Sequence, residues 1–322
     1  MKSAIVTGAT GFIGSRMVRY LLAKGYHVLA LGRIDFSLID PLRMQKHDNL
    51  AYINLPMEKI EDLIGYKDQF GFDPSDECVF YHFAWSGHKG LSDLSVSGQM
   101  KNVTQSVNAY KVADALGCSK FVHVGTMEEA FGDAYLKLDH HINKEYNRHV
   151  VYAVAKQITR FSLKAIQKNL KTDLIIVCKS HVLGPNDARD SLLRQTMKMI
   201  VNGERLEFTS GEQTFDVISI TDCVKGFEAI GLYGKDNAEY WIGSGHPRAL
   251  KEYLQIMINR YSKNHPHEFG AKKYSDLKLA KDVFTPPALH DDTGFKCSQT
   301  YEEACDEMYA WFKDNKLVEV NE

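Results

Sequence analysis

The sequence predicts an α/β fold with a doubly wound parallel sheet, because short apolar runs alternate with segments of helical periodicity. The expected strands are the apolar runs at 3–7, 27–31, 50–54, 77–84, 120–125 and 172–178. The expected helices are the amphipathic segments near 12–24, 97–116 and 150–169. In an open parallel sheet, ligands bind beyond the carboxyl ends of the strands. We therefore expect a ligand cleft lined by the loops that follow residues 7, 32, 84, 125 and 178.

The first strand runs directly into three glycines at three-residue spacing, Gly8, Gly11 and Gly14. Gly8 and Gly11 allow the backbone to turn tightly against a pyrophosphate, and Gly14 allows the following helix to pack closely on the sheet. The first N–H groups of that helix would then hold the phosphates. Because the loop lies between an apolar strand and an amphipathic helix, it predicts a dinucleotide site of the Rossmann type. Its expected contacts are Gly8, Thr10, Gly11, Phe12, Ile13 and Gly14.

The regular alternation ends near residue 178, after which glycines divide the chain into shorter pieces. We expect a dinucleotide-binding domain of residues 1–178 and about 212–245, and a smaller substrate-binding region of 179–211 and 246–322. The length of 322 residues and the hydrophobic content of 44% are sufficient for a large core.

The composition narrows the expected partners. A formal charge of -2 gives no electrostatic footprint for nucleic acid or an anionic membrane, so a small-molecule substrate is expected. No apolar run reaches the roughly 18 residues of a membrane span, and the six scattered cysteines form no Cys-x-x-Cys pair, so we expect a reduced, cytoplasmic protein. Adjacent side chains point apart, so His140-His141 does not predict a metal site, and no metal is expected.

The end of the second strand bears on the choice of cofactor. NAD sites of this type usually carry an acidic residue there, whereas this chain has Arg33. The guanidinium of Arg33 suits the 2′-phosphate of NADP (NADPH), and the missing carboxylate removes a repelling charge. Asp35 lies two residues later and could bind the ribose of NAD instead, so NADP is favoured without excluding NAD. Asn54 and Leu55, at the end of the third strand, are expected near the adenine.

Tyr152 and Lys156 form a Tyr-x-x-x-Lys pattern that places both side chains on one face of a helix. A free tyrosine has a pKa of about 10, so proton transfer near neutrality requires a depression of roughly three units, or about 4 kcal/mol. A lysine cation at about 5 Å supplies on the order of 3 kcal/mol at an effective dielectric of about 20. The pattern also arises by chance on surface helices. Support comes from Thr126, which follows the fifth strand at the same edge of the sheet and can bind a substrate carbonyl.

In this order, the glycine loop, Thr126 and Tyr152-x-x-x-Lys156 resemble the extended short-chain dehydrogenase/reductase family, of the NAD-dependent epimerase/dehydratase type. The resemblance covers nearly the whole chain and includes His82-Phe83-Ala84, Asn102, Leu183-Gly184-Pro185 and Trp241-Ile242-Gly243-Ser244-Gly245. It implies Tyr152 as general acid or base, Lys156 as its electrostatic partner and ribose ligand, and Thr126 as carbonyl anchor. The further cofactor contacts that it implies are Phe83, Ala84, Trp85, Asn102, Tyr152 and Lys156.

Two segments, Phe80 to Trp85 and Gly211 to Asp216, are similar to bacterial enzymes that act on nucleotide-linked 6-deoxyhexoses, particularly 4-keto-sugar reductases. Together with Arg33, this resemblance implies NADPH-dependent reduction of a 4-keto-6-deoxy nucleotide sugar in deoxysugar biosynthesis. The main alternative is a nucleotide-sugar 4-epimerase, which uses the same three residues. A 4,6-dehydratase is less favoured, because the acid pair typical of those enzymes is shifted here to Glu128-Glu129. A non-catalytic NADP-binding redox sensor is the alternative from another class, and it need retain only the glycine loop.

The substrate is expected to meet Thr126 and Glu128 at its sugar and cationic groups at its diphosphate. The substrate-binding candidates are Thr126, Glu128, Lys179, His181, Arg189, Arg205 and Arg248. The simpler interpretation of Glu128 and Glu129 is a pair of solvated loop carboxylates. The chain departs from the family's pattern at Arg148, where a proline is common, and at His181, where an asparagine is common.

The helices near 97–116 and 150–169 carry apolar stripes that include Val103, Val107, Val154, Ile158 and Phe161. Such stripes usually face the core. In the family that the chain resembles, the corresponding helices pair across a two-fold axis, which implies a homodimer.

Overall fold

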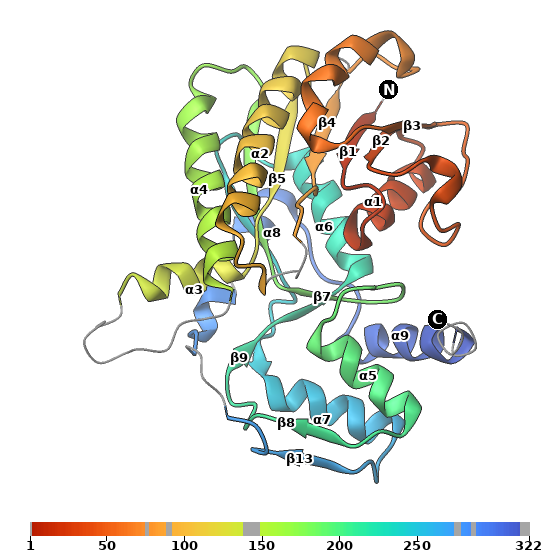
Figure 1. Cartoon of the computed structure of the whole chain (residues 1–322), viewed down its shortest axis with the longest axis vertical. Helices are drawn as coiled ribbons and strands as arrows, with labels where there is room; N and C mark the ends of the chain where they lie inside the picture. The colour runs from red at the N-terminus through yellow and green to blue at the C-terminus, as the bar shows by residue number, and fades with distance from the viewer. Residues whose placement is uncertain are drawn as a thin grey trace.

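The computed structural model describes residues 2–74, 77–87, 92–137, 149–273, 278–284 and 288–315. A seven-stranded sheet forms its centre, in the order β11-β6-β5-β4-β1-β2-β3 (Figure 1). Every neighbouring pair of these strands is parallel, so the predicted doubly wound parallel sheet is confirmed. The strands are β1 (Ser3–Thr7), β2 (His27–Gly32), β3 (Leu50–Asn54), β4 (Cys78–His82), β5 (Lys120–Val124), β6 (Asp173–Lys179) and β11 (Glu239–Ile242).

Helices cover both faces of this sheet. On one face, α2 (Val96–Leu116) packs against α4 (Val150–Gln167) and the 3-10 segment η2 (Met57–Gln69). On the other face, α6 (Ile220–Tyr233) packs against α1 (Phe12–Ala23) and α8 (Ala288–Thr293). The sheet lies between these two layers, with the carboxyl ends of its strands directed toward the smaller region (Figure 1).

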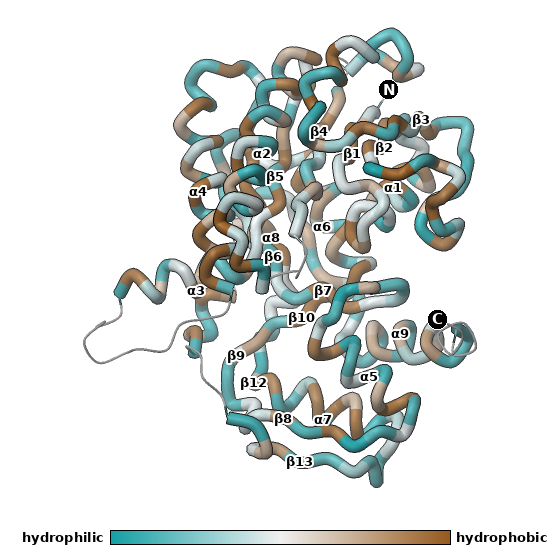
Figure 2. Tube along the Cα trace, in the orientation of Figure 1, coloured by the Kyte–Doolittle hydropathy of each residue, from teal (hydrophilic) through white to brown (hydrophobic). Residues whose placement is uncertain are grey.

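Coverage on both faces explains why the strands are apolar without interruption. In β1 all five residues are buried, and their side chains alternate between two hydrophobic clusters. Ala4 and Val6 join the cluster that contains α1 and α6, whereas Ile5 joins the cluster that contains α2. Figure 2 shows apolar and polar segments alternating along the helices that cover the sheet, such as α4.

The apolar runs in the sequence do not predict β11, the seventh strand of the sheet. β11 has only four residues, of which Glu239 is exposed and Trp241 is partly exposed. It pairs with β6 alone, at the edge of the sheet. An edge strand of this length has too few apolar residues to be recognised from hydrophobicity.

A smaller region lies beyond the carboxyl ends of the sheet (Figure 1). Its paired strands are β7 (His181–Leu183) with β10 (Val217–Ser219), β8 (Leu206–Phe208) with β13 (His267–Phe269), and β9 (Thr214–Phe215) with β12 (Arg248–Ala249). Its helices are α5 (Leu192–Asn202), α7 (Leu250–Tyr261) and α9 (Tyr301–Asp314), which share a third hydrophobic cluster. The division into residues 1–178 with about 212–245, and 179–211 with 246–322, stays a proposal; β9 and β10 fall within 212–245 but pair with β12 and β7 of the smaller region. The helix α8 belongs to the smaller region by this division, but it packs on α6 and on β11 of the large sheet.

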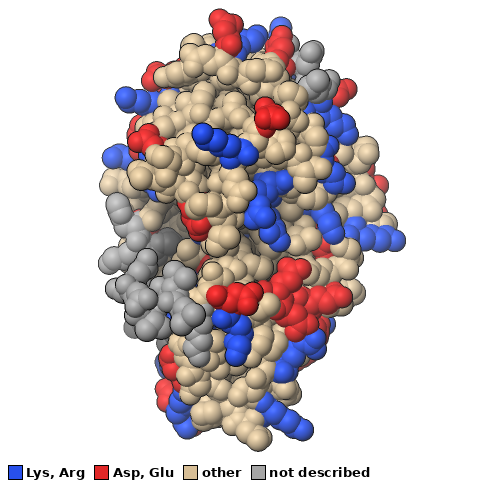
Figure 3. Space-filling model, turned by 90° about the vertical axis from the view of Figure 1, so that its right-hand side faces the viewer, with Lys and Arg blue, Asp and Glu red and all other residues tan. Residues whose placement is uncertain are grey.

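Three short elements complete the described chain: η1 (Phe36–Leu38) after β2, α3 (Glu128–Tyr135) after β5, and η4 (Lys281–Phe284) before α8. On the face shown in Figure 3, basic side chains lie beside a group of acidic ones, so neither sign forms a continuous surface there. Within the described ranges, no helix is both long enough and apolar enough to cross a membrane.

Candidate active site

The glycine loop, residues 8–14, connects β1 to α1 and leaves the N-terminus of α1 open. Gly8 has a φ of 65°, in the left-handed region that favours glycine. A Cβ on Gly8 would lie 2.9 Å from the backbone nitrogen of Ala84, and a Cβ on Gly14 would overlap the carbonyl of Gly8. Gly11 precedes α1 and provides no side-chain cap, so the first N–H groups of the helix remain available to a phosphate. The loop therefore has the close packing and the open donors that a dinucleotide pyrophosphate requires.

Two side chains, Asn102 on α2 and Thr7 on β1, hold the loop that follows β4 against the glycine loop. The amide of Asn102, on α2, donates to the carbonyl of Ser86 at 2.7 Å and accepts from its nitrogen at 2.8 Å. The Thr7 hydroxyl accepts from the nitrogen of Ala84 at 3.2 Å and lies 2.8 Å from Nδ1 of His82. Both ends of the Asn102 amide are thus occupied, and this residue shapes the loop.

The residues expected at the adenosine end lie at the ends of β2 and β3. Arg33 is exposed, whereas Asp35 accepts a hydrogen bond from Nδ2 of Asn54 at 3.0 Å. Leu55 is 5% exposed and belongs to the core, and its nitrogen donates to the carbonyl of Gly32 at 2.8 Å. Arg33 therefore offers an accessible positive charge, while the nearest carboxylate already has a partner.

Tyr152 and Lys156 lie one turn apart on α4, whose first turns face Thr126 beyond the end of β5. The hydroxyl of Tyr152 lies close enough to the hydroxyl of Thr126 for the two to interact. The Lys156 Nζ donates to the carbonyl of Val124 at 2.7 Å and lies 3.7 Å from the centroid of the Trp85 ring. Trp85 also meets the Tyr152 ring edge-on, with centroids 5.9 Å apart. Trp85, expected as a cofactor contact, thus packs against both catalytic candidates.

Burial dominates the acid–base properties of this pair. Lys156 is 4% exposed, and burial lowers its pKa to about 7 although the nearby Glu129 carboxylate opposes that change. Burial also raises the pKa of Tyr152 well above its ordinary value, and the interaction with Thr126 only partly offsets this. Without a cofactor, burial therefore outweighs the lowering of the Tyr152 pKa that is expected from Lys156, and the role of Lys156 as electrostatic partner stays a prediction. Desolvation outweighs charge attraction while the ammonium group points at Val124.

Glu128 and Glu129 begin α3 and are 7% and 2% exposed, so the interpretation as solvated carboxylates is wrong. Glu129 accepts a hydrogen bond from the nitrogen of Thr126 at 3.0 Å and pairs with Nε of Arg160 at 3.5 Å. Glu128 lies 3.1 Å from Nδ1 of His149. Glu129 therefore positions the carbonyl anchor, whereas Glu128 occupies the side of α3 near Tyr152.

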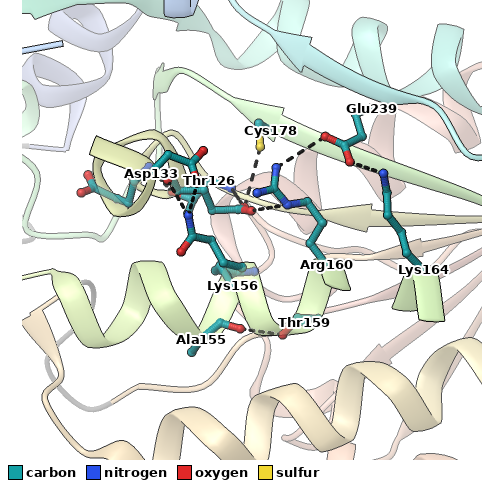
Figure 4. Close-up of polar contacts among 12 residues, drawn as sticks. Thr126, Asp133, Ala155, Lys156, Thr159, Arg160, Lys164, Cys178 and Glu239 are labelled. Atoms are coloured by element: carbon teal, nitrogen blue, oxygen red, sulfur yellow. Dashed lines mark hydrogen bonds and ion pairs between the residues drawn. The ribbon is translucent and has the colours of Figure 1, made fainter. Parts of the chain in front are cut away.

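A polar network behind α4 was not predicted from the sequence. Figure 4 shows Arg160 and Lys164 both directed at Glu239, and Arg160 forms its ion pair with this residue at 3.4 Å. The Cys178 thiol donates to Glu129 at 3.7 Å. The network joins α3, α4, β6 and β11. Its only sequence signal is the repetition of polar residues every four positions along α4, starting at Tyr152.

Three of the predicted substrate residues lie on β6, β7 and the loop that follows. The His181 ring lies 5.5 Å from that of Phe215, and burial lowers its pKa to about 3, which keeps it neutral. Arg189 is fixed by Asp187 through hydrogen bonds of 2.8 and 2.9 Å. Burial, and then the charge of Arg189, lower the pKa of Lys179 to about 8.

Arg205 and Arg248 lie apart from these three substrate candidates. Arg205 pairs with Glu268 at 2.7 Å, at the β8/β13 edge that lies farthest from the large sheet (Figure 1). Arg248 pairs with Glu302 at 3.5 Å and lines a cavity of about 600 Å³ bordered by α8 and the start of α9. Thr126, Tyr152 and Lys156 do not line that cavity. The structure thus places these two arginines apart from the other candidates.

No group of three His, Cys, Asp or Glu side chains is arranged as metal ligands in the part of the chain that the structure describes. His140, His141 and Arg148 lie outside the described residues.

Comparison with known proteins identifies the family. A model of the NAD dependent epimerase/dehydratase family matches residues 4–243. The chain belongs to this family. It is thus an enzyme of the extended short-chain dehydrogenase/reductase class.

The chain is 25% identical to dTDP-glucose 4,6-dehydratase of Streptomyces griseus over 97% of this chain and 94% of that one. It is 24% identical to dTDP-6-deoxy-L-talose 4-dehydrogenase (NAD(+)) of Aggregatibacter actinomycetemcomitans over 85% of this chain and 97% of that one.

Among solved structures, the Bordetella bronchiseptica enzyme WbmG in complex with NAD matches with a TM-score of 0.76 at 15% identity. The match covers 97% of the present chain and 94% of WbmG. At this identity the likeness concerns the fold, and it extends through the smaller region as well as the sheet.

Proposed function

We propose that the protein reduces a 4-keto-6-deoxy nucleotide sugar with NADPH, as a step in deoxysugar biosynthesis. The observation that carries the proposal is geometric: the Tyr152 hydroxyl lies beside the hydroxyl of Thr126, which can bind a substrate carbonyl, and Trp85 packs edge-on against the Tyr152 ring. Burial raises the pKa of Tyr152, so the hydroxyl keeps its proton. Ketone reduction needs a proton donor, whereas alcohol oxidation needs a phenolate. The 4-dehydrogenase among the relatives acts at the same position of a 6-deoxy sugar.

In the proposed mechanism, the glycine loop and Lys156 would hold the cofactor, which supplies a hydride to the carbonyl carbon when bound. Tyr152 donates its phenolic proton to the carbonyl oxygen, so that the ketone becomes a secondary alcohol. Thr126 donates a hydrogen bond to the same oxygen and stabilises the charge that develops on it. The Lys156 cation stabilises the phenolate left on Tyr152 until it regains a proton from water.

The preference for NADPH rests on Arg33. Its exposed guanidinium at the end of β2 suits a 2′-phosphate, and the carboxylate of Asp35, two residues later, is engaged by Asn54. The related WbmG was solved with NAD and the 4-dehydrogenase is named for NAD(+), so the preference is a property proposed for this chain alone.

Dehydration is the second candidate, because Glu128 is a buried carboxylate close to Tyr152. A 4,6-dehydratase needs an additional acid or base beyond the tyrosine, and Glu128 has a suitable position. The side chain is already 3.1 Å from His149, however, and the neighbouring acid, Glu129, is committed to the backbone of Thr126. We therefore place reduction first.

Product analysis by mass spectrometry tests the proposal. The protein is incubated with NADPH or NADH and a panel of 4-keto-6-deoxy sugars linked to CDP, dTDP, GDP and UDP. We expect a gain of two hydrogens in one member of the panel, with NADPH consumed at least about tenfold faster than NADH. In a parallel incubation with the unoxidised sugar nucleotides, loss of water would instead establish the dehydratase, and an isomer of unchanged mass, resolved by chromatography, would establish the epimerase. NADPH binding without any turnover would favour the redox sensor.

We also propose a homodimer formed through α4. Val154, Ile158 and Phe161 repeat at helical spacing on this helix and are 39%, 38% and 62% exposed, so they do not face the core as the sequence suggests. We expect Phe161→Glu to raise the dimer dissociation constant at least about 100-fold, because each buried ring contributes about 1.5–3 kcal/mol and both subunits change. Sedimentation over a concentration series measures this. Leu38→Glu, at another exposed apolar residue, should leave the dimer intact; a monomeric wild type would refute the proposal.

A further inference from the structure

Two arginines join the loop of residues 184–189 to the glycine loop. Arg43, in the segment after β2, donates to the carbonyl of Thr10 at 2.9 Å and to the carbonyl of Asn186 at 3.2 Å. A single guanidinium thus connects the segment after β2, the glycine loop and the loop after β7. These three segments surround the N-terminus of α1, where a pyrophosphate would be held.

The second arginine, Arg189, comes from the 184–189 loop itself. Its guanidinium donates to both carboxylate oxygens of Asp187, at 2.8 and 2.9 Å, and to the carbonyl of Val182 at 3.1 Å. The centre of the guanidinium lies 4.8 Å from the ring centroid of Phe12, the first residue of α1. Asp187 is 3% exposed, so this arrangement is anchored in the protein interior. Arg189 keeps 44% of its side chain accessible, which leaves it able to contact a ligand.

Arg189 is close enough to Lys179 and His181 to lower the pKa of both, but its guanidinium packs on the glycine-loop side of the cleft, against Phe12. It lies over the first residue of the dinucleotide-binding helix, and it is also close enough to influence the charge state of Tyr152. A group between the N-terminus of α1 and the catalytic tyrosine lies along the path of a dinucleotide, whose pyrophosphate meets the helix and whose nicotinamide meets the tyrosine. Asp187 and Val182 engage Nε and Nη2 of Arg189, which fixes the guanidinium and leaves Nη1 to donate to a phosphate oxygen.

We propose that Arg189 binds the pyrophosphate of the dinucleotide cofactor, and that the 184–189 loop forms a strap over it which Arg43 holds closed against the glycine loop. This inference rests on the proposed function, because it requires that the protein bind a nicotinamide dinucleotide. It moves Arg189 from the substrate side of the cleft, where the sequence analysis placed it, to the cofactor side.

Binding measurements with Arg189→Gln test the inference without relying on turnover. The ligands are NADPH and ADP-ribose, which contain the pyrophosphate, AMP, which lacks it, and CDP, dTDP, GDP and UDP, which represent the substrate's diphosphate. Calorimetry should show NADPH and ADP-ribose bound about 10- to 100-fold more weakly by the variant. The affinities for AMP and for the nucleoside diphosphates should stay within about twofold.

Arg189→Lys, which keeps the charge but not the fork, should give an intermediate loss, and it serves as the main variant if Arg189→Gln does not fold. Arg260→Gln is the matched control, because Arg260, on α7, is as exposed as Arg189, is likewise held by an aspartate, Asp306, through two hydrogen bonds, and should leave every affinity unchanged. Unchanged ADP-ribose binding in both Arg189 variants would overturn the inference, as would a loss confined to a nucleoside diphosphate. A wild-type protein that binds no NADPH would instead overturn the proposed function.

Discussion

Tyr152→Phe is expected to lower kcat for keto-sugar reduction about 10³-fold while the dissociation constants of NADPH and of the substrate change less than about threefold. The variant removes one hydroxyl, which is the proton donor of the proposed mechanism. The ring should keep its place, because its edge-on contact with Trp85, with centroids 5.9 Å apart, does not depend on the oxygen. The loss should therefore appear in the chemical step, and stopped-flow measurement of NADPH oxidation in a single turnover would detect it there.

Tyr20→Phe is a suitable control for the loss of a tyrosine hydroxyl, since that group bonds Glu228 at 2.6 Å on the α1 side of the sheet. It should leave kcat unchanged. If Tyr152→Phe lowered kcat less than about tenfold, another group would have to donate the proton. Glu128, buried near Tyr152, would then be the first residue to test, by combining the variant with Glu128→Gln.

The fold was predictable because each of its central strands is apolar along its length and each helix between them has a regular stripe. The glycine loop was predictable for the same reason, since Gly8 and Gly14 serve contacts within a few residues of themselves or with the neighbouring strand's end. Periodicity and local spacing are properties of a single segment. They can therefore be recognised without knowing where any other segment lies.

The environment of the catalytic residues was not predictable in this way. The expectation for Tyr152 and Lys156 considered their mutual distance on one helix, but burial dominates their charge states, and Trp85, which packs on both, comes from another loop. Glu129 is likewise buried beside Arg160, which reaches it from α4. Such pairings depend on the packing of distant segments, and no spacing within either segment encodes them.

Lys156→Met is expected to abolish most activity and yet to stabilise the protein relative to the wild type, increasingly as the pH falls. Burial lowers the pKa of Lys156 to about 7 from an ordinary value of 10.5. Between these two values the unfolded chain binds the proton and the folded protein does not, so the free energy of unfolding of the wild type should rise with pH by about 1.4 kcal/mol per unit. Below pH 7 the folded state holds the cation at full cost, whereas methionine fills the same space without charge.

The measurement is the difference in the free energy of unfolding between wild type and Lys156→Met, from urea titrations at pH 7, 8 and 9. This difference should move in favour of the wild type by about 2–3 kcal/mol across that range, because the other ionisable groups are common to both proteins. Lys164→Met, two turns along α4, controls for the loss of a lysine that pairs with Glu239.

Parallel pH curves for wild type and Lys156→Met would show that the folded protein keeps Lys156 charged. The ammonium would then be stabilised chiefly by its contacts with Val124 and Trp85, 2.7 Å from the carbonyl and 3.7 Å from the ring centroid. If Lys156→Met were also fully inactive in that case, the Lys156 cation would be required for every turnover.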